Sequence, residues 1–306
     1  MIQFLPKTNF DFVGKRYYAF AFSGVLVTLG IIAFIFVFMG KANLGIDFAG
    51  GTMIQGSFEK NISVGEIRSA LDLAGYRDAQ IQKLQREVPN SFLIRVKSTG
   101  EIVGQVGQNI LKALEKKYPA NKFKQDSIDE VGPVVGKILQ KQARLAVILA
   151  FLGLLIYIWV RFDFRFGVAA TIATFHDGLA ILGIMFILQK EITLLIVTAI
   201  LALCGYSLTD TVVVYDRIRE NLKLFRKKGD FDGIINSSIN EILNRTLMTG
   251  GTTFVAVFSV FLFAGEVVHD FSLALLMGIL IGTYSSWFVA STIMVEWEKR
   301  APKRFK

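Results

Sequence analysis

The sequence predicts an α-helical polytopic membrane protein with six transmembrane helices and a small α+β ferredoxin-like domain outside the cytoplasm. Three observations support this fold class. Apolar residues are concentrated in six long runs, a polar stretch separates the first two runs, and Lys and Arg accumulate on one side of the resulting topology. Hydrophobic residues make up 53% of the 306 residues, compared with about 45–50% in soluble domains.

Each apolar run is long enough to cross a membrane, since about 20 apolar residues span roughly 30 Å of hydrocarbon. The runs are Tyr17–Met39, Ala143–Val160, Phe166–Leu188, Ile192–Val214, Leu247–Gly265 and Phe271–Val295. The first run follows Lys15 and Arg16, as a signal peptide would. It is longer than a usual signal-peptide core and no small-residue cleavage site follows it, so an uncleaved span is predicted.

The basic residues of the short loops predict the orientation, because Lys and Arg accumulate in cytoplasmic loops. The N-terminal segment, the turn 161–165, the loop 215–246 and the C-terminal tail hold Lys7, Lys15, Arg16, Arg161, Arg165, Arg217, Arg219, Lys223, Arg226, Lys227, Lys228, Arg245, Lys299, Arg300, Lys303, Arg304 and Lys306. The opposite short loops hold only Lys190. Both termini are therefore expected in the cytoplasm. The net charge of +9 could suggest a nucleic-acid partner. The distribution of the basic residues instead indicates that they determine the membrane topology.

These features predict four regions. Residues 1–40 form the cytoplasmic N-terminus and first span, 41–142 the extracytoplasmic domain, 143–298 a five-helix bundle with the cytoplasmic loop 215–246, and 299–306 a basic cytoplasmic tail. The single cysteine, Cys204, lies within an apolar run, so an intrachain disulfide is excluded and a metal site is not expected.

The extracytoplasmic region has the element order βαββαβ, which is typical of a ferredoxin-like sandwich. The expected strands are Thr52–Phe58, Ala79–Gln85, Ser91–Lys97 and Lys122–Val131, with Ile81 and Leu84 pointing inward and helices beginning near Ser63 and Ile102. Ser63 and Glu66 have the spacing of a capping box. The region contains no His or Cys, which favours a binding or structural domain over an enzyme.

Asp210, near the end of the fourth run, is the most informative polar residue, because an ionisable group inside a span costs roughly 2.5–3.5 kcal/mol. Ser207 and Arg217 lie on the same helix face. A structural ion pair or an interfacial acid is one interpretation. The other is a carboxyl group that binds and releases a proton, since burial in a low dielectric favours the neutral form of an acid.

A second polar stripe opens the fifth run, where Arg245, Thr249, Thr252 and Thr253 have the spacing of one helix face. It fits a pathway or a counter-ion for Asp210. The alternative is a basic anchor whose Thr hydroxyls bond their own backbone carbonyls.

The third run carries His176 and Asp177 near its midpoint. Adjacent side chains diverge by about 100° on a helix, so the two are not expected to face one partner together. They fit either a titrating site or a hydrogen-bonded interior pair. Gly278 and Gly282 predict close helix packing, and 231–243 predicts an interfacial helix.

Three motifs then resemble one family. The first is the sequence 45–51, with Gly45, Asp47, Phe48, Gly50 and Gly51, and the second is Gly205–Asn221, which includes Asp216 and Arg217. The third is Gly282–Ser286. Together they resemble the SecF family of the resistance–nodulation–division superfamily, and the resemblance covers essentially the whole chain.

The resemblance implies an accessory, non-enzymatic subunit of bacterial protein export. It would act with SecD to drive late polypeptide translocation across the inner membrane with the proton gradient. SecD, the SecYEG channel, exported polypeptides and the lipid bilayer are the implied partners, with YajC as a further candidate. No cofactor is expected beyond the proton gradient, and sodium stays open as the coupling ion.

The resemblance also assigns residues. Asp210 and Arg245 stand where the family places its proton-relay residues, and His176 and Asp177 are further relay candidates. Asp216, Arg217, Ser207 and Thr249 are expected at the cytoplasmic end of the relay or in structural roles. A superfamily exporter of lipids or small amphiphiles, and a passive scaffold, are the alternative functions.

Overall fold

The computed structural model describes residues 8–84, 88–97, 104–224 and 231–301. Backbone contacts divide the chain into two units, one comprising Leu44–Leu145 and the other Met1–Asn43 with Ala146–Lys306. Several predicted features lie outside the described residues, namely Lys7, Gln85, Ile102, Arg226, Lys227, Lys228, Lys303, Arg304 and Lys306.

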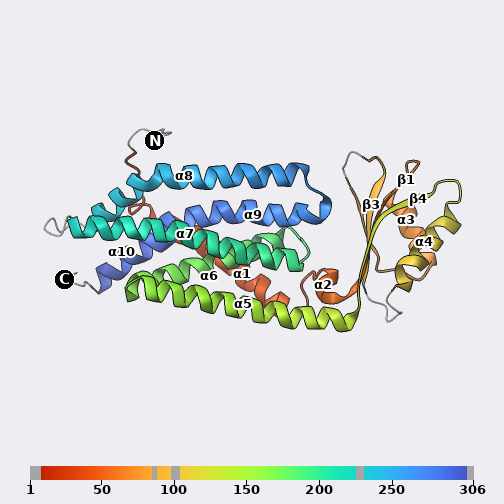
Figure 1. Cartoon of the computed structure of the whole chain (residues 1–306), viewed down its shortest axis with the longest axis horizontal. Helices are drawn as coiled ribbons and strands as arrows, with labels where there is room; N and C mark the ends of the chain where they lie inside the picture. The colour runs from red at the N-terminus through yellow and green to blue at the C-terminus, as the bar shows by residue number, and fades with distance from the viewer. Residues whose placement is uncertain (1–7, 85–87, 98–103, 225–230, 302–306) are drawn as a thin grey trace. The chain divides into compact units, whose positions relative to one another are not determined.

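Six helices within the described residues are long and apolar enough to cross a membrane, which confirms the six predicted spans. They are α1 (Arg16–Phe38), α5 (Pro133–Arg161), α6 (Phe164–Ile187), α7 (Leu194–Leu224), α8 (Phe231–Phe263) and α9 (Glu266–Ser285), the last continuing through a π-helical turn η1 (Ser286–Ala290) into α10 (Ser291–Arg300). Figure 1 shows these helices as an elongated bundle.

Several helices are longer than the apolar runs that predicted them. Helix α7 continues to Leu224, and α5 begins at Pro133. Residues 231–243 are helical, as predicted, but they form the first turns of α8 and not a helix that ends before the fifth span. An apolar run marks the stretch that matches hydrocarbon, whereas a helix continues for as long as its backbone hydrogen bonds and packing favour it.

Helices α1, α6, α7 and α9 pack closely through glycines. A Cβ atom at Gly183 would lie 2.7 Å from the backbone nitrogen of Gly30, and one at Gly282 would lie 2.8 Å from the Cβ atom of Ser207. A Cβ atom at Gly278 would overlap the side chain of Leu203. The close packing predicted for Gly278 and Gly282 is therefore confirmed, with α7 as the neighbouring helix.

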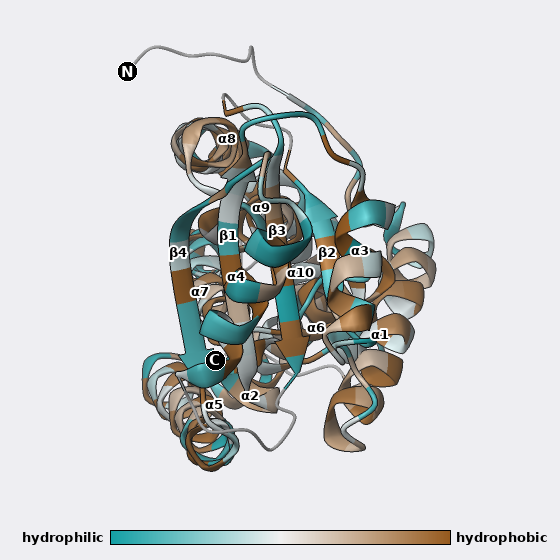
Figure 2. Cartoon of the chain, turned by 90° about the vertical axis from the view of Figure 1, so that its right-hand side faces the viewer, coloured by the Kyte–Doolittle hydropathy of each residue, from teal (hydrophilic) through white to brown (hydrophobic). Residues whose placement is uncertain are grey.

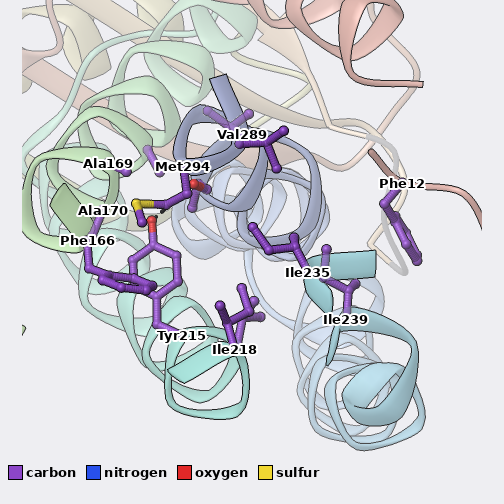
Figure 3. Packing of buried hydrophobic residues seen from close by; sticks show 14 of the residues in the cluster. Phe12, Phe166, Ala169, Ala170, Tyr215, Ile218, Ile235, Ile239, Val289 and Met294 are labelled. Atoms are coloured by element: carbon purple, nitrogen blue, oxygen red, sulfur yellow. Dashed lines mark hydrogen bonds between the residues drawn. The ribbon is translucent and has the colours of Figure 1, made fainter. Parts of the chain in front are cut away.

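Ion pairs gather at the end of the bundle where α1 begins and α10 ends, which we call the charged end. Its pairs are Arg16–Glu296, Arg161–Asp216, Arg165–Glu298, Arg217–Glu241 and Lys299–Asp232. A buried cluster that includes Phe166, Tyr215 and Met294 joins α6, α7 and α10 (Figure 3). Elsewhere α1, α5 and α8 expose large apolar side chains, as a lipid-facing surface would. Figure 2 shows much of α1 in the brown of hydrophobic residues.

The other unit holds a four-stranded antiparallel sheet in the order β2-β3-β1-β4. Its elements are α2 (Ile46–Ala49), β1 (Gly51–Phe58), α3 (Val64–Leu73), β2 (Gln80–Lys83), β3 (Ser91–Lys97), α4 (Gln105–Lys117) and β4 (Phe123–Val131). The βαββαβ order is confirmed, and α2 is an additional short helix. The core contains Ile54, Ile67, Phe92, Ile94 and Ile110.

The predicted capping box is present at the start of α3. The Glu66 carboxylate accepts hydrogen bonds from the backbone N–H and the hydroxyl of Ser63, both at 2.8 Å. These bonds hold the pKa of Glu66 below its ordinary value. Of the two residues predicted to point inward from β2 and its end, Leu84 is buried and Ile81 is half-buried.

The glycine contact between α1 and α6 yields a prediction. Gly183→Ala should destabilise the protein by about 1–3 kcal/mol, because the added methyl group meets backbone atoms of α1 that cannot move aside. Thermal unfolding of the purified protein in one fixed lipid–detergent mixture measures the effect.

The matched control is Gly24→Ala, also a helical glycine, where nothing lies within 4 Å of the added Cβ atom. This change should be neutral or slightly stabilising, because Ala favours helix over Gly. Equal unfolding temperatures for the two variants would show that the α1–α6 contact is not tight.

Candidate functional site

Asp177 lies at the meeting point of three helices. Its side chain on α6 is 1% exposed, and its Oδ2 atom accepts hydrogen bonds from the hydroxyl of Ser207 on α7 and, at 2.8 Å, from the hydroxyl of Ser285 on α9. The Oδ1 atom lies 2.9 Å from Nδ1 of His176. Asp177 is therefore held by hydrogen bonds on both oxygens.

His176 and Asp177 contact each other directly, which the argument from helix geometry did not anticipate. Their Cβ atoms diverge along the helix, but the two side chains bend toward each other. The interior hydrogen-bonded pair, which the sequence left open, is the arrangement present. Nε2 of His176 is buried and has no hydrogen-bond partner among the described residues.

Asp210 lies three residues beyond Ser207 on α7, on the same side of the helix. It is 7% exposed, and its Oδ2 atom is buried with no hydrogen-bond partner in the described part of the chain. The positive charge that acts on it is Arg245 of α8. A buried carboxyl oxygen without a partner costs free energy while it is ionised, so its protonation state is sensitive to its surroundings.

Arg217 does not pair with Asp210. The interpretation of Asp210 as one half of a structural ion pair with Arg217 is therefore wrong. Its Nε atom lies 2.5 Å from Oε2 of Glu241 on α8, and its Nη1 atom lies 2.6 Å from Oε2 of Glu220. The side chain extends toward the charged end, where these carboxylates can reach it.

Asp216 is paired with Arg161, whose Nη2 atom lies 2.7 and 2.6 Å from the two carboxylate oxygens. Asn221 donates hydrogen bonds to Glu241 at 2.9 Å and to Ser238 at 3.0 Å. The motif from Asp216 to Asn221 therefore joins α7 to α5 on one side and to α8 on the other.

The Thr residues of the α8 stripe bond their own helix, as the structural alternative predicted. The hydroxyl of Thr249 donates to the Arg245 carbonyl at 3.1 Å, that of Thr252 to the Met248 carbonyl at 2.9 Å, and that of Thr253 to the Thr249 carbonyl at 3.0 Å. Arg245, Thr249 and Thr252 are nevertheless exposed, so this chain leaves a polar face of α8 uncovered.

A surface cavity of about 430 Å³ lies between α7 and α8 at the charged end. It is lined by Val213, Asp216, Arg217, Glu220, Glu241, Ile242 and Arg245. Five of these residues carry ionisable groups, which favours water as the occupant. Arg245 can thus contact water even though it belongs to a membrane-spanning helix.

Four polar residues of this region were given no individual site role from the sequence, namely Ser285, Ser286, Thr211 and Glu241. The first three lie within the motifs Gly282–Ser286 and Gly205–Asn221. The Thr211 and Ser286 hydroxyls lie 3.0 Å apart, and the Ser286 hydroxyl donates to the Gly282 carbonyl at 2.9 Å. The π-helical turn begins at Ser286, and such turns occur frequently at functional sites. The four-residue spacing of Ser207 and Thr211 was a usable signal for a polar face.

The glycine signature at 45–51 shapes the start of β1. Gly50 has φ +73°, and a Cβ atom at Gly51 would overlap the Val96 carbonyl. The carbonyl of Phe48 accepts a hydrogen bond from Nε2 of Gln140 at 2.8 Å. Gly45 precedes the first turn of α2, which contains Asp47. The signature therefore forms a tight turn within the α+β unit.

No cluster of three or more His, Cys, Asp and Glu residues suited to a metal ion occurs among the residues that the structure describes. Cys204 is buried, with Sγ 3.9 Å from the Thr174 carbonyl. The side chains described above carry carboxyl, imidazole, guanidinium and hydroxyl groups.

Two family models match this chain. One is described as the C-terminal region of the protein export membrane proteins SecD/SecF and matches residues 110–300. The other is the SecD/SecF GG motif and matches residues 35–61, which include the glycine signature.

Relatives and solved structures agree with these models. The protein translocase subunit SecF of Thermodesulfovibrio yellowstonii is 48% identical, covering 96% of this chain and 97% of that protein. The SecF subunit of Endomicrobium trichonymphae is 37% identical, covering 100% and 96%. The crystal structure of SecDF, a translocon-associated membrane protein from Thermus thermophilus, is 33% identical with a TM-score of 0.83, covering 96% of this chain and 39% of that longer chain.

The matched models, the near-complete coverage of these relatives and the shared six-helix architecture lead to one conclusion: this chain belongs to the SecF family of protein translocase subunits.

Proposed function

We propose that this protein acts with a SecD partner beside the SecYEG channel and uses the proton gradient to drive the late translocation of polypeptides across the bacterial inner membrane. The proposal rests on the buried carboxyl group of Asp210. Its Oδ2 atom has no hydrogen-bond partner among the described residues, and Arg245 supplies a nearby positive charge within the membrane-spanning helices. The role is non-enzymatic.

In this mechanism Asp210 takes up a proton on the extracytoplasmic side and releases it toward the cytoplasm. The ionised form attracts Arg245 and the neutral form does not, so α7 and α8 have a different preferred arrangement in each state. Each proton contributes about 2.3 kcal/mol per 100 mV of membrane potential. That amount is enough to bias a modest helix rearrangement.

Asp177 and His176 extend the relay into the bundle. Ser207 bonds Asp177 and lies one helical turn from Asp210, so its hydroxyl group is suited to stand between the two carboxyl groups. Asp216 and Arg217 support the relay by holding α7 to its neighbours, and Thr249 follows Arg245 on the exposed face of α8. The proton is the proposed coupling ion, and sodium is the alternative.

The exposed polar face of α8, formed by Arg245, Thr249 and Thr252, supports a partnership with SecD. An arginine facing hydrocarbon costs several kcal/mol, so such residues in spans usually face protein or water. SecD is the proposed cover for this face. The Lys and Arg residues of the charged end support a cytoplasmic location for both termini, and YajC is a further candidate partner.

Asp210→Asn tests the relay. The variant keeps the shape of the side chain but cannot ionise, so it should insert and assemble normally and lose the gradient-dependent part of export. Arg245→Met should act similarly, and the double variant should be no worse than either, because residues that act as a unit are non-additive. The assay is completion of polypeptide translocation into membrane vesicles with and without an imposed proton gradient.

Thr209→Ala is a control for Asp210→Asn, since Thr209 adjoins Asp210 but is exposed and bonds the carbonyl of Tyr206. It should respond to the gradient as the parent does. An Asp210→Asn protein with the full gradient response would eliminate the relay.

The SecD contact is tested by site-specific cross-linking. In a Cys204→Ala background, a cysteine at Thr252 on the polar face of α8 should form a cross-link to SecD in native membranes. The control is a cysteine at Ile156 of α5, which is 65% exposed on an apolar helix face and should face lipid. A cross-link at Ile156 but not at Thr252 would mean that SecD contacts α5 and not α8, which would contradict the proposed interface.

A further inference from the structure

The segment that precedes α1 is bound along the first turns of α8 through its own main chain. Oδ1 of Asn236 accepts a hydrogen bond from the backbone N–H of Phe12 at 2.8 Å. Asn240 bonds both backbone groups of Phe10, accepting from its N–H and donating to its carbonyl, each at 2.9 Å. Asn236 and Asn240 are one helical turn apart, so α8 presents two amides in line along one face.

Phe12 anchors this segment. It is 5% exposed, while Phe10 is 57% exposed. The Phe12 ring lies 6.0 Å from that of Trp287 and 5.1 Å from that of Phe288, both in the π-helical turn η1. It belongs to the same buried cluster as Ile235 and Ile239 of α8 (Figure 3). One side chain therefore joins α8 to η1.

The far end of the segment is fixed as well. The backbone N–H of Gly14 donates to Oδ1 of Asp11 at 2.7 Å, which closes a turn before α1. Arg16 donates from Nη1 to the Val13 carbonyl at 2.9 Å and pairs through Nε with Glu296 of α10 at 2.6 Å. The segment thus contacts α8 and η1, while Arg16, the first residue of α1, pairs with Glu296 of α10.

The segment contacts the half of α8 that holds the buried residues of this helix. All the buried residues of α8 lie between Ile235 and Gly250. In the most apolar stretch of this helix, only 11% of the residues are buried. Arg245 lies five residues after Asn240, about 7.5 Å along the helix axis. A segment that holds Asn236 and Asn240 therefore acts on the part of α8 that carries Arg245.

We propose that residues 8–13 form an intramolecular strap, anchored by Phe12, that holds the first half of α8 against η1 and so positions Arg245 relative to Asp210. The importance of that position rests on the proposed function. The hydrogen bonds to Asn236 and Asn240 use only main-chain groups of the strap, so the identity of its side chains matters chiefly at the buried positions 12 and 13.

The test measures the spacing of α7 and α8 directly. Val213 and Ile242 line the same cavity from these two helices. In a Cys204→Ala background, cysteines at both positions should be joined by a short bis-maleimide in membranes that contain the full complex. Adding Phe12→Ala should lower the yield of this cross-link several-fold. Phe12→Leu should restore most of it, because the anchor requires a large apolar group.

Phe10→Ala is the matched control and should leave the yield unchanged, because Phe10 is exposed on the same strap. If Phe12→Ala protein does not accumulate, the double variant Asn236→Ala and Asn240→Ala removes the main-chain bonds while keeping the anchor, and should lower the yield as well. An unchanged cross-link in every strap variant would overturn the proposal.

A second readout separates the strap from the relay. Without the cysteine pair, Phe12→Ala should lose much of the gradient-dependent part of export at an unchanged protein level and unchanged SecD association. A reduced cross-link together with a full gradient response would support the strap and contradict the role of Arg245.

Discussion

The hydrogen bonds of Asp177 join the central helices of the bundle. Hydrocarbon offers no hydrogen-bond partners, so each polar group between membrane helices must be satisfied by the protein or by enclosed water. Asp177 meets this requirement with Ser207, Ser285 and His176, which ties α6 to α7 and α9. Asp210, on the same face of α7 as Ser207, has an oxygen for which the described residues supply no partner. The contrast between a satisfied and an unsatisfied carboxyl group is the physical basis of the proposed relay.

The glycines and the π-helical turn make this network possible. A serine hydroxyl is short, so it reaches Asp177 only where the helix backbones approach closely. Gly282 permits that approach, since its Cβ position would lie 2.8 Å from Ser207. The π-helical turn follows directly after Ser285, and its last carbonyl, at Ala290, accepts a hydrogen bond from the hydroxyl of Tyr215 at 3.1 Å. The turn therefore sits between the polar network and the buried aromatic cluster of the charged end.

Most of the fold could be predicted from the sequence because its signals are local. Six apolar runs, a capping box at Ser63 and alternation in the strands each report the structure of a few neighbouring residues. Helix ends were less predictable. The first turns of α8 are amphipathic, and nothing in their pattern distinguishes a separate surface helix from the beginning of a span.

The partners of the polar residues were the least predictable part of the site. Ser207, Asp210 and Arg217 share one face of α7 by periodicity, yet Ser207 bonds Asp177 and Arg217 pairs with Glu241. Asp210 makes neither contact and is acted on by the charge of Arg245. These pairings depend on which helix packs where, and residues such as Ser285 and Glu241 approach α7 from distant parts of the chain. The main-chain bonds of Asn236 and Asn240 left no local signal at all.

In the proposed function, Asp210 carries protons across the membrane during translocation. Proton flux can be measured with a pH-sensitive dye enclosed in liposomes that contain the complete export complex, while a substrate polypeptide is being translocated. We expect a flux that accompanies translocation in the parent protein and is absent in Asp210→Asn, with Thr209→Ala unchanged. A flux of equal size in the parent and in Asp210→Asn would contradict it.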